Sequence, residues 1–351
     1  MSRKTRVIKV GSVPIGGGNP VVIQSMTKTR TSDADSTVAQ IRALEVAGCQ
    51  IVRCAVKDEA DALAIREIKE RINIPLVADI HFNYRLAVMA AESGADKLRI
   101  NPGNIGDDKS IKAVVSAARS RGIPIRIGVN SGSLEKDILR KHGHTTAAAL
   151  VESAMRNIRT LEKLKFRDMI ISIKSTSVPA TIEANRILAG KVRYPLHIGI
   201  TEAGTPNSGI VRSSAGIGAL LAGGVGDTVR VSLTSDPVEE VRVAREVLKS
   251  LELISSGISV ISCPTCGRTE IDVEAIATEV ERRTKHIKMP LRVAIMGCEV
   301  NGPGEAADAD VGMAGGRGLG LIFREGQVIR KVPESELIDA LVDEIESMAI
   351  R

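Results

Sequence analysis

Eight short runs rich in β-branched residues, each followed by a segment of helical composition, occupy the first two thirds of this 351-residue chain. The runs are Val21–Thr27, Gln50–Val56, Leu76–Phe82, Lys97–Gly103, Ile125–Asn130, Met169–Ser175, Leu196–Glu202 and Thr228–Thr234. Such alternation is typical of βα units that build a parallel sheet. Eight units in roughly 230 residues match a (β/α)₈ barrel. We therefore predict an α/β fold with a TIM barrel, because an open doubly wound sheet rarely has eight evenly spaced units.

The pattern changes near Ser255-Ser256-Gly257, where we place a domain boundary. Residues 1–255 are predicted to form the barrel, with an N-terminal hairpin over residues 5–20, and residues 256–351 a small α+β module. In this module we expect strands at Ile258–Ser262, Leu291–Met296, Asp310–Ala314, Leu319–Arg324 and Gln327–Val332, and helices at Asp272–His286 and Glu334–Met348. The glycines of Gly315–Gly320 do not open a helix, so a hairpin turn is favoured over a phosphate loop.

The amino-acid composition limits the classes of molecule that this chain is expected to bind. The net charge of +6 suits either a nucleic acid or an anionic small substrate. Aromatic residues make up only 1% of the chain, which argues against stacking on single-stranded nucleic acid, and we expect no nucleic-acid partner. Five cysteines, with no signal peptide or long apolar span, indicate a cytoplasmic protein of a reducing compartment that does not enter a membrane.

Cationic residues stand inside or at the carboxyl ends of the predicted barrel strands, where the active site of a TIM barrel lies. They are Arg53, Arg99, Arg126, Lys174 and Arg230. Five cations that converge on one mouth would repel each other strongly unless an anion or carboxylates lay among them. Guanidinium groups match phosphate oxygens in shape, and lysine adds a compact charge. The pattern predicts a substrate with two or more phosphates.

Two carboxylates, Asp79 and Glu202, follow barrel strands and are candidates for proton transfer. Asp79 could equally serve only to balance the arginines, so Glu202 is the better candidate base. His197 could orient a substrate, whereas His81 is interpreted as structural. Cys49 and Cys54 flank an apolar strand and are most simply buried packing residues.

Three cysteines mark the second module, two in Cys263-Pro264-Thr265-Cys266 and one in Gly297-Cys298-Glu299. Thiolates at this spacing suit zinc or an iron–sulfur cluster. A fourth cysteine does not follow, and the nearest later donor is Glu305, a hard ligand that could exchange with substrate. A structural zinc site and a redox Cys-x-x-Cys motif are the alternatives.

Several motifs together resemble one enzyme family. They are Val22-Ile23-Gln24-Ser25-Met26-Thr27, Ala78-Asp79-Ile80-His81-Phe82, Arg99-Ile100-Asn101-Pro102-Gly103-Asn104, Ile127-Gly128-Val129-Asn130-Ser131-Gly132-Ser133, His197-Ile198-Gly199-Ile200-Thr201-Glu202-Ala203-Gly204, Cys263-Pro264-Thr265-Cys266-Gly267-Arg268 and Gly297-Cys298-Glu299-Val300-Asn301-Gly302-Pro303-Gly304-Glu305. Along essentially its whole length the chain resembles the hydroxymethylbutenyl diphosphate synthase family of the non-mevalonate isoprenoid pathway, in its compact bacterial form.

The resemblance implies a [4Fe–4S] cluster held by Cys263, Cys266, Cys298 and Glu305. It implies reductive ring opening of 2-C-methyl-D-erythritol 2,4-cyclodiphosphate, with loss of water, by two one-electron transfers from ferredoxin or flavodoxin. It further implies a homodimer. The diphosphate contacts that it implies are Arg53, Arg99, Arg126, Asn130, Lys174, Arg230 and Ser232. Thr201 and Glu202 are expected to face the reacting centre.

Two other classes of protein fit parts of the sequence. One is a barrel aldolase that forms a Schiff base at Lys174 and carries a structural zinc module. The other is a zinc-ribbon protein that binds nucleic acid, suggested by the sequence pI of about 9.1 and the Cys-x-x-Cys spacing.

Overall fold

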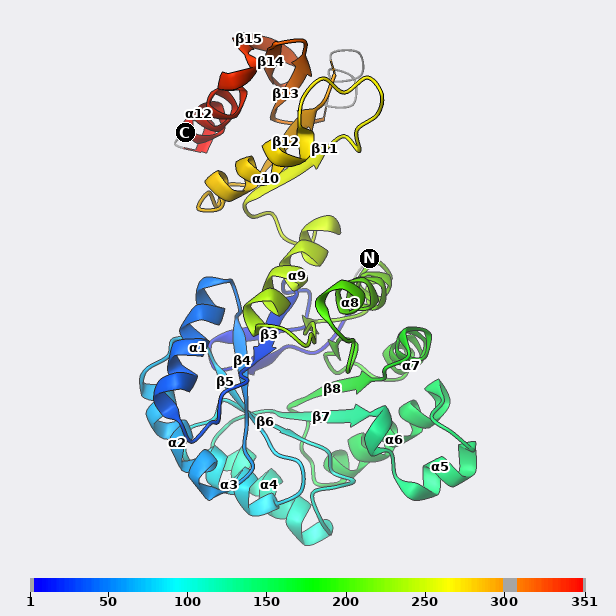
Figure 1. The fold of residues 1–351 in the computed structure, drawn as a ribbon. Coiled ribbons are helices and arrows are strands. Elements are labelled where there is room, and N and C mark those ends of the chain that lie inside the picture. Colours follow the sequence, from blue (N-terminus) through cyan, green and yellow to red (C-terminus); the bar gives the residue numbers. More distant parts are fainter. Residues whose placement is uncertain (1–2, 299–307, 350–351) are drawn as a thin grey trace. The chain divides into compact units, whose positions relative to one another are not determined.

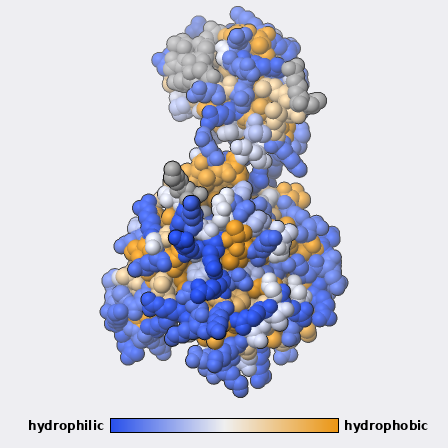
Figure 2. All heavy atoms as spheres, turned by 180° about the vertical axis from the view of Figure 1, so that it is seen from behind, coloured by the Kyte–Doolittle hydropathy of each residue, from blue (hydrophilic) through white to orange (hydrophobic). Residues whose placement is uncertain are grey.

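The computed structural model describes residues 3–298 and 308–349, which divide into two compact units, Met1–Leu253 and Ile254–Arg351 (Figure 1). Within the described residues, none of the helices is both long and apolar enough to cross a membrane. Figure 2 shows one face of the molecule, on which hydrophilic side chains cover most of the barrel unit and hydrophobic ones are scattered between them. Scattered apolar residues of this kind are normal for a protein surface.

The first unit contains an eight-stranded parallel sheet in the order β8-β7-β6-β5-β4-β3-β10-β9. Its strands are β3 (Val22–Met26), β4 (Ile51–Ala55), β5 (Leu76–Asp79), β6 (Lys97–Ile100), β7 (Ile125–Asn130), β8 (Met169–Lys174), β9 (His197–Ile198) and β10 (Thr228–Val229). A parallel bridge between Ile171 and Leu196 joins β8 to β9 and brings the two ends of the sheet together. The predicted TIM barrel is confirmed.

The helices alternate with the strands and surround the barrel (Figure 1). They are α1 (Ala34–Val46), α2 (Glu59–Glu70), α3 (Tyr84–Glu92), α4 (Asp108–Ser120), α6 (Ala147–Lys163), α7 (Val178–Lys191), α8 (Pro206–Ala222) and α9 (Pro237–Ser250). Several begin at a side chain that accepts a hydrogen bond from the first turn, as Asp33, Asp58 and Asp107 do. A short helical turn, η1 (Ser131–Ser133), and helix α5 (Lys136–His142) are inserted between β7 and α6.

The strand ends differ from the prediction. The runs that begin at Leu196 and Thr228 form only two residues of strand each, because the backbone leaves the sheet after β9 and β10. Gly199, with φ of 158°, and Glu202, with φ of 52°, lie in this irregular segment after β9. A positive φ at a residue with a side chain is uncommon and occurs often at functional sites.

An N-terminal hairpin covers the amino end of the barrel. Its strands are β1 (Ile8–Val10) and β2 (Val13–Ile15), which pair antiparallel as predicted. Their apolar side chains pack against the first residues of several barrel strands, in a core of Ile8, Val10, Ile15, Val22, Ile51, Val77 and Ile170. Since this end is filled by hydrocarbon, the polar side chains gather at the carboxyl ends of the strands.

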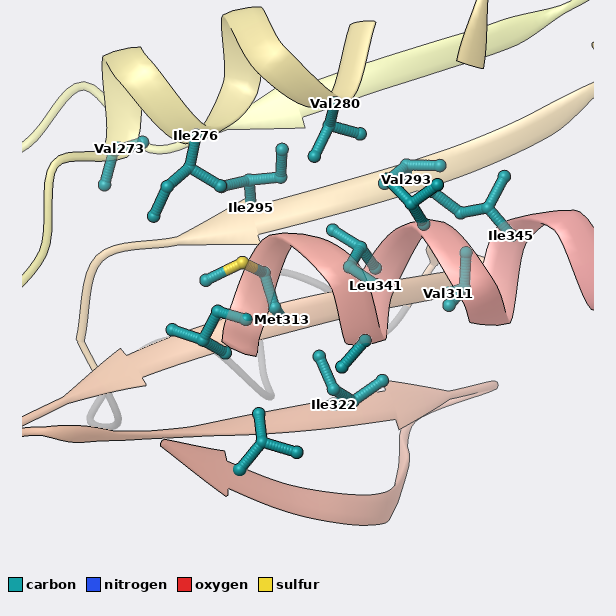
Figure 3. Packing of buried hydrophobic residues seen from close by; sticks show 14 of the residues in the cluster. Val273, Ile276, Val280, Val293, Ile295, Val311, Met313, Ile322, Leu341 and Ile345 are labelled. Atoms are coloured by element: carbon teal, nitrogen blue, oxygen red, sulfur yellow. The ribbon is translucent and has the colours of Figure 1, made fainter. Parts of the chain in front are cut away.

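The second unit is a five-stranded mixed sheet with helices α10 (Val273–Thr284) and α12 (Leu337–Ala349). Its strands are β11 (Ile258–Ser262), β12 (Leu291–Met296), β13 (Val311–Gly316), β14 (Leu319–Arg324) and β15 (Gln327–Pro333), followed by η2 (Glu334–Glu336). Both helices pack on the sheet through Ile276, Val293, Met313, Leu341 and Ile345 (Figure 3). Gly316 pairs with Leu319, so the glycine-rich stretch is the predicted hairpin.

Candidate active site

A cavity of about 190 Å³ opens at the carboxyl ends of the barrel strands. Its walls are formed by Met26, Arg53, Asp79, His81, Arg99, Arg126, Asn130, Ser172, Lys174, Thr201, Arg230 and Ser232. The structure thus brings together the cations, Asn130, Thr201 and Ser232 that the sequence analysis named as substrate contacts. Glu202 follows Thr201 directly but is exposed and does not line the cavity.

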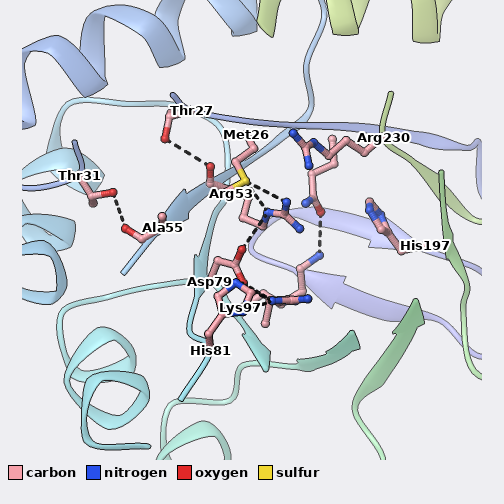
Figure 4. A network of polar contacts seen from close by, with 12 residues as sticks. Met26, Thr27, Thr31, Arg53, Ala55, Asp79, His81, Lys97, His197 and Arg230 are labelled. Atoms are coloured by element: carbon pink, nitrogen blue, oxygen red, sulfur yellow. Dashed lines mark hydrogen bonds and ion pairs between the residues drawn. The ribbon is translucent and has the colours of Figure 1, made fainter. Parts of the chain in front are cut away.

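The cavity wall holds five lysine and arginine side chains and a single carboxylate, Asp79. Asp79 is 3% exposed and accepts a hydrogen bond of 2.9 Å from Arg99 Nη1, while its other oxygen lies 3.5 Å from Arg53 Nε (Figure 4). Burial by itself would raise the pKa of Asp79. Arg53, a hydrogen bond with His81, and Arg99 outweigh burial and lower this pKa. Asp79 therefore stays ionised and fits the charge-balancing role better than that of a base.

Arg126 and Arg53 are buried cations of the wall, and of the two only Arg53 lies beside a carboxylate of the described chain, Asp79. Arg126 is 1% exposed, and its Nε and Nη2 atoms have no hydrogen-bond partner within the described residues. Burial, followed by repulsion from Arg53 and Arg99, lowers the pKa of Arg126. Burial also lowers the pKa of Arg53 to about 9, despite the attraction of Asp79. Because guanidinium groups remain protonated in proteins, these shifts express an electrostatic cost that a bound anion would remove.

Lys174, the last residue of β8, adds a further buried charge. Its Nζ atom lies 3.2 Å from Nε2 of His197, and burial together with Arg230 and Arg126 lowers the pKa of the ammonium group. Two glycines leave room for the cations. A Cβ atom at Gly199 would lie 2.8 Å from Lys174 Nζ, and one at Gly128 would lie 2.5 Å from Arg99 Nε. The glycines of these two motifs thus permit the charges to approach the cavity.

The sequence analysis did not single out two buried charges beside the cavity. Glu240 of α9 is 2% exposed, accepts a 2.9 Å hydrogen bond from Leu233 N, and lies 3.5 Å from Arg230 Nη2. It therefore fixes Arg230 and the segment that carries Ser232. Lys97, at the start of β6, is completely buried and lies 3.4 Å from Gln24 Oε1. A lysine before the apolar Leu98 and Ile100 was a usable signal for a buried charge.

The cysteines of the second unit follow two neighbouring parallel strands. Cys263 directly follows β11 and Cys298 follows β12 by one residue, so both leave the sheet at the same edge. Gly297 N donates a hydrogen bond of 3.2 Å to Cys263 Sγ, and Thr265 between the first two cysteines has φ of 61°. An amide that donates to sulfur is the environment expected of a thiolate ligand.

A complete ligand set is not part of the described structure. In residues 3–298 and 308–349, groups of three or more His, Cys, Asp or Glu close enough to hold a metal ion do not occur. Glu305 lies outside the described residues. The three cysteines offer sulfur donors, two of them at the ends of neighbouring strands, and this chemistry fits zinc or an iron–sulfur group.

Outside the cavity, Cys49 and Cys54 are 3% and 0% exposed, which confirms the prediction that they are buried. Burial raises the pKa of both thiols to about 12, so they are unreactive.

Solved structures share the architecture of the barrel. A dihydropteroate synthase from Stenotrophomonas maltophilia is 14% identical, with a TM-score of 0.51, over 71% of this chain and 97% of that one. A type I 3-dehydroquinate dehydratase from Clostridium difficile is also 14% identical with a TM-score of 0.51, over 71% and 98%. At this identity the likeness concerns the fold alone.

Comparison of the whole sequence is more specific. Residues 5–245 match the GcpE TIM-barrel domain, and residues 259–347 match the GcpE protein C-terminal domain. A protein from Caldanaerobacter subterraneus subsp. tengcongensis is 60% identical over 99% of this chain and 98% of its own. One from Geobacillus thermodenitrificans is 59% identical over 99% and 92%. Both are named 4-hydroxy-3-methylbut-2-en-1-yl diphosphate synthase (flavodoxin). This chain therefore belongs to the GcpE family, the family of these synthases.

Proposed function

We propose that this chain is an iron–sulfur oxidoreductase of isoprenoid precursor biosynthesis. It converts 2-C-methyl-D-erythritol 2,4-cyclodiphosphate to (E)-4-hydroxy-3-methylbut-2-enyl diphosphate by reductive ring opening and loss of water. The observation that carries this proposal is the cavity wall, where five cations face one carboxylate, in a chain 60% identical to a synthase of that name. A cyclic diphosphate supplies the negative charge that this wall lacks.

Diphosphate binding is assigned to the residues of the wall. Arg53, Arg99, Arg126, Asn130, Lys174, Arg230 and Ser232 hold the phosphate oxygens. Asp79 orients Arg53 and Arg99, and Glu240 orients Arg230, so the donors are fixed before the substrate arrives. The charge of the wall also favours encounter with an anion.

Proton handling is assigned to the segment after β9. Thr201 lines the cavity, and Glu202, which follows it, is exposed to solvent. Thr201 orients the reacting carbon–oxygen centre, and Glu202 moves the proton that the departing water requires.

Reducing equivalents require a cofactor. Cys263, Cys266, Cys298 and Glu305 would hold a [4Fe–4S] cluster, which supplies electrons one at a time and has an exchangeable ligand in Glu305. The Gly297 amide stabilises the Cys263 thiolate. Flavodoxin, which appears in the names of the relatives, or ferredoxin is proposed as the electron donor. We further propose a cytoplasmic homodimer that acts on a small molecule and binds neither nucleic acid nor a membrane.

A product assay tests this function directly. The chain is purified without oxygen and mixed with the cyclodiphosphate and reduced flavodoxin, and the product is identified by mass spectrometry. We expect hydroxymethylbutenyl diphosphate to accumulate with oxidation of two flavodoxin equivalents per product. Unchanged substrate, with either flavodoxin or ferredoxin as donor, would refute the proposal.

A barrel aldolase remains the second candidate because Lys174 is buried and its pKa is lowered, as for a lysine that forms Schiff bases. Borohydride reduction in the presence of phosphorylated aldehydes or ketones distinguishes the two. Our proposal expects no covalent adduct at Lys174. An adduct found there by peptide mass spectrometry would favour the aldolase.

A further inference from the structure

A hydrogen-bonded chain of three side chains runs from the cavity into the barrel wall. It begins at Lys174 on β8, passes through His197 on β9 and ends at Thr228 on β10. We propose that His197 and Thr228 are positioning residues, which hold the Lys174 ammonium in place for the diphosphate. This inference rests on the proposed function, because it concerns how the proposed substrate is bound.

The geometry is set by three consecutive strands. Thr228 and His197 are paired across β10 and β9, and His197 Nδ1 lies 2.5 Å from Thr228 Oγ1. His197 Nε2 lies 3.2 Å from Lys174 Nζ. Both His197 and Thr228 are fully buried and neither lines the cavity (Figure 4 shows His197). Any effect that they have on a bound ligand therefore passes through Lys174.

The direction of each hydrogen bond in this series follows from the chemistry of Lys174 and Thr228, the residues at its two ends. A lysine ammonium has three donors and no acceptor, so Nε2 of the imidazole must accept from it. The proton of a neutral imidazole then lies on Nδ1 and is donated to Thr228 Oγ1. The threonine hydroxyl thus selects the tautomer that can accept from Lys174.

The electric field around His197 keeps the ring neutral. Burial, followed by repulsion from Lys174, Arg126 and Lys97, lowers the pKa of the imidazole. A neutral ring can accept from the ammonium, whereas a protonated ring would repel it. A diphosphate in the cavity, which Lys174 lines and His197 does not, favours the charge of the pair on Lys174.

The backbone crowds the Lys174 ammonium on the side of Gly199. The backbone at Gly199 is so close that an added Cβ atom would lie 2.8 Å from Nζ and 2.3 Å from the carbonyl oxygen of Arg230. Without the acceptor on His197, the ammonium would remain among Arg230 and Arg126 with its proton less stabilised. It would then deprotonate or turn away, and the diphosphate would lose a charged contact.

The test measures the dissociation constant of the cyclodiphosphate by calorimetry on anaerobic holoenzyme, together with KM and kcat. His197→Phe keeps the ring volume and removes the acceptor, and we expect the dissociation constant to rise about tenfold or more. His197→Gln restores an acceptor near Nε2 and should recover most of the affinity.

Thr228 provides an independent variant that leaves His197 in place. Thr228→Val keeps the branched shape but removes the hydroxyl, so the tautomer is no longer fixed and affinity should fall in the same direction. Thr228→Ser keeps the hydroxyl and should bind nearly as the parent does. His142→Gln, at a histidine paired with Glu152 on α6, is the matched control and should change nothing.

The outcomes separate this inference from the proposed function. Parental affinity in folded His197→Phe and Thr228→Val would overturn the positioning role; if His197→Phe fails to fold, Thr228→Val decides alone. A parent protein that neither binds nor converts the cyclodiphosphate would instead refute the proposed function.

Discussion

At the scale of single residues, the cavity is distinguished by buried positive charges that outnumber the carboxylates beside them. Arg126 is the clearest case, since it is buried and two of its nitrogen atoms are unpartnered in the described part of the chain. Such a group costs free energy in the empty protein and gains it when an anion arrives. We propose that this uncompensated charge is the source of the site's affinity for an anion.

Arg126→Ala tests this account. We expect KM for the cyclodiphosphate to rise by at least about tenfold, because a charge-assisted contact to phosphate is lost, while the folded protein becomes no less stable. Steady-state kinetics and urea unfolding measure the two effects. Arg121→Ala, at the exposed residue that caps the C-terminus of α4, is the control. An unchanged KM for Arg126→Ala would contradict the phosphate role.

Lys97 offers a pH test. Burial, with repulsion from Arg126 and Arg53, places the pKa of the folded state well below the ordinary value of 10.5. Below pH 10.5 the unfolded state therefore binds more protons, and stability falls as pH falls, by up to about 1.4 kcal/mol per unit. Lys97→Met removes this slope. Urea unfolding from pH 10 to pH 7 should show the variant gaining stability relative to the parent as pH falls; a constant difference would contradict the lowered pKa of Lys97.

The sequence identified the five cations of the wall because each lies at or inside a predicted strand end. It did not reveal Glu240, since Val238-Glu239-Glu240-Val241 offers two adjacent glutamates and only the structure shows which one is buried. The partner of Arg230 is therefore set by the tertiary packing of α9. Lys97 was not predicted as a site residue because it lies at the start of β6, whereas the active site of a TIM barrel lies at the carboxyl ends of the strands.

At the scale of elements, the barrel strands were predictable and their lengths were not. β-branched runs specify a strand, but β9 and β10 stop after two residues because glycine and polar residues lead the backbone out of the sheet. Helix α5 was not predicted, since Lys136–His142 is short and strongly polar, and its stability depends on contacts such as His142 with Glu152.

Gly199→Ala tests the importance of the segment after β9. The new Cβ atom would lie 2.3 Å from the carbonyl oxygen of Arg230, which backbone atoms cannot easily relieve, and φ is 158°. We expect a loss of about 2 kcal/mol or more in the free energy of unfolding and weaker substrate binding. Gly132→Ala, where an added Cβ atom would meet nothing within 4 Å, should leave the free energy of unfolding nearly unchanged. Equal stability of the two variants would contradict the tight packing described here.

At the scale of the whole molecule, the two units supply different chemistry, a cationic cavity from the barrel and sulfur donors from the mixed sheet. The cysteine pattern was visible in the sequence, because it consists of local motifs. The parallel pairing of β11 with β12 then explains how Cys263 and Cys298, which are 35 positions apart, lie at the same edge of the sheet.

Glu305→Cys tests the exchangeable ligand. A fourth thiolate binds iron firmly, so we expect the variant to keep iron and acid-labile sulfide and to lose turnover. Elemental analysis and the product assay measure both. Glu274→Gln, on the exposed face of α10, is the control. Undiminished turnover in Glu305→Cys would rule out ligand exchange.

The most direct test of the central claim is the content of iron, acid-labile sulfide and zinc in protein purified without oxygen. The account predicts equal amounts of iron and sulfide, as in a [4Fe–4S] cluster, and no stoichiometric zinc. Zinc in place of iron, with no acid-labile sulfide, would contradict it.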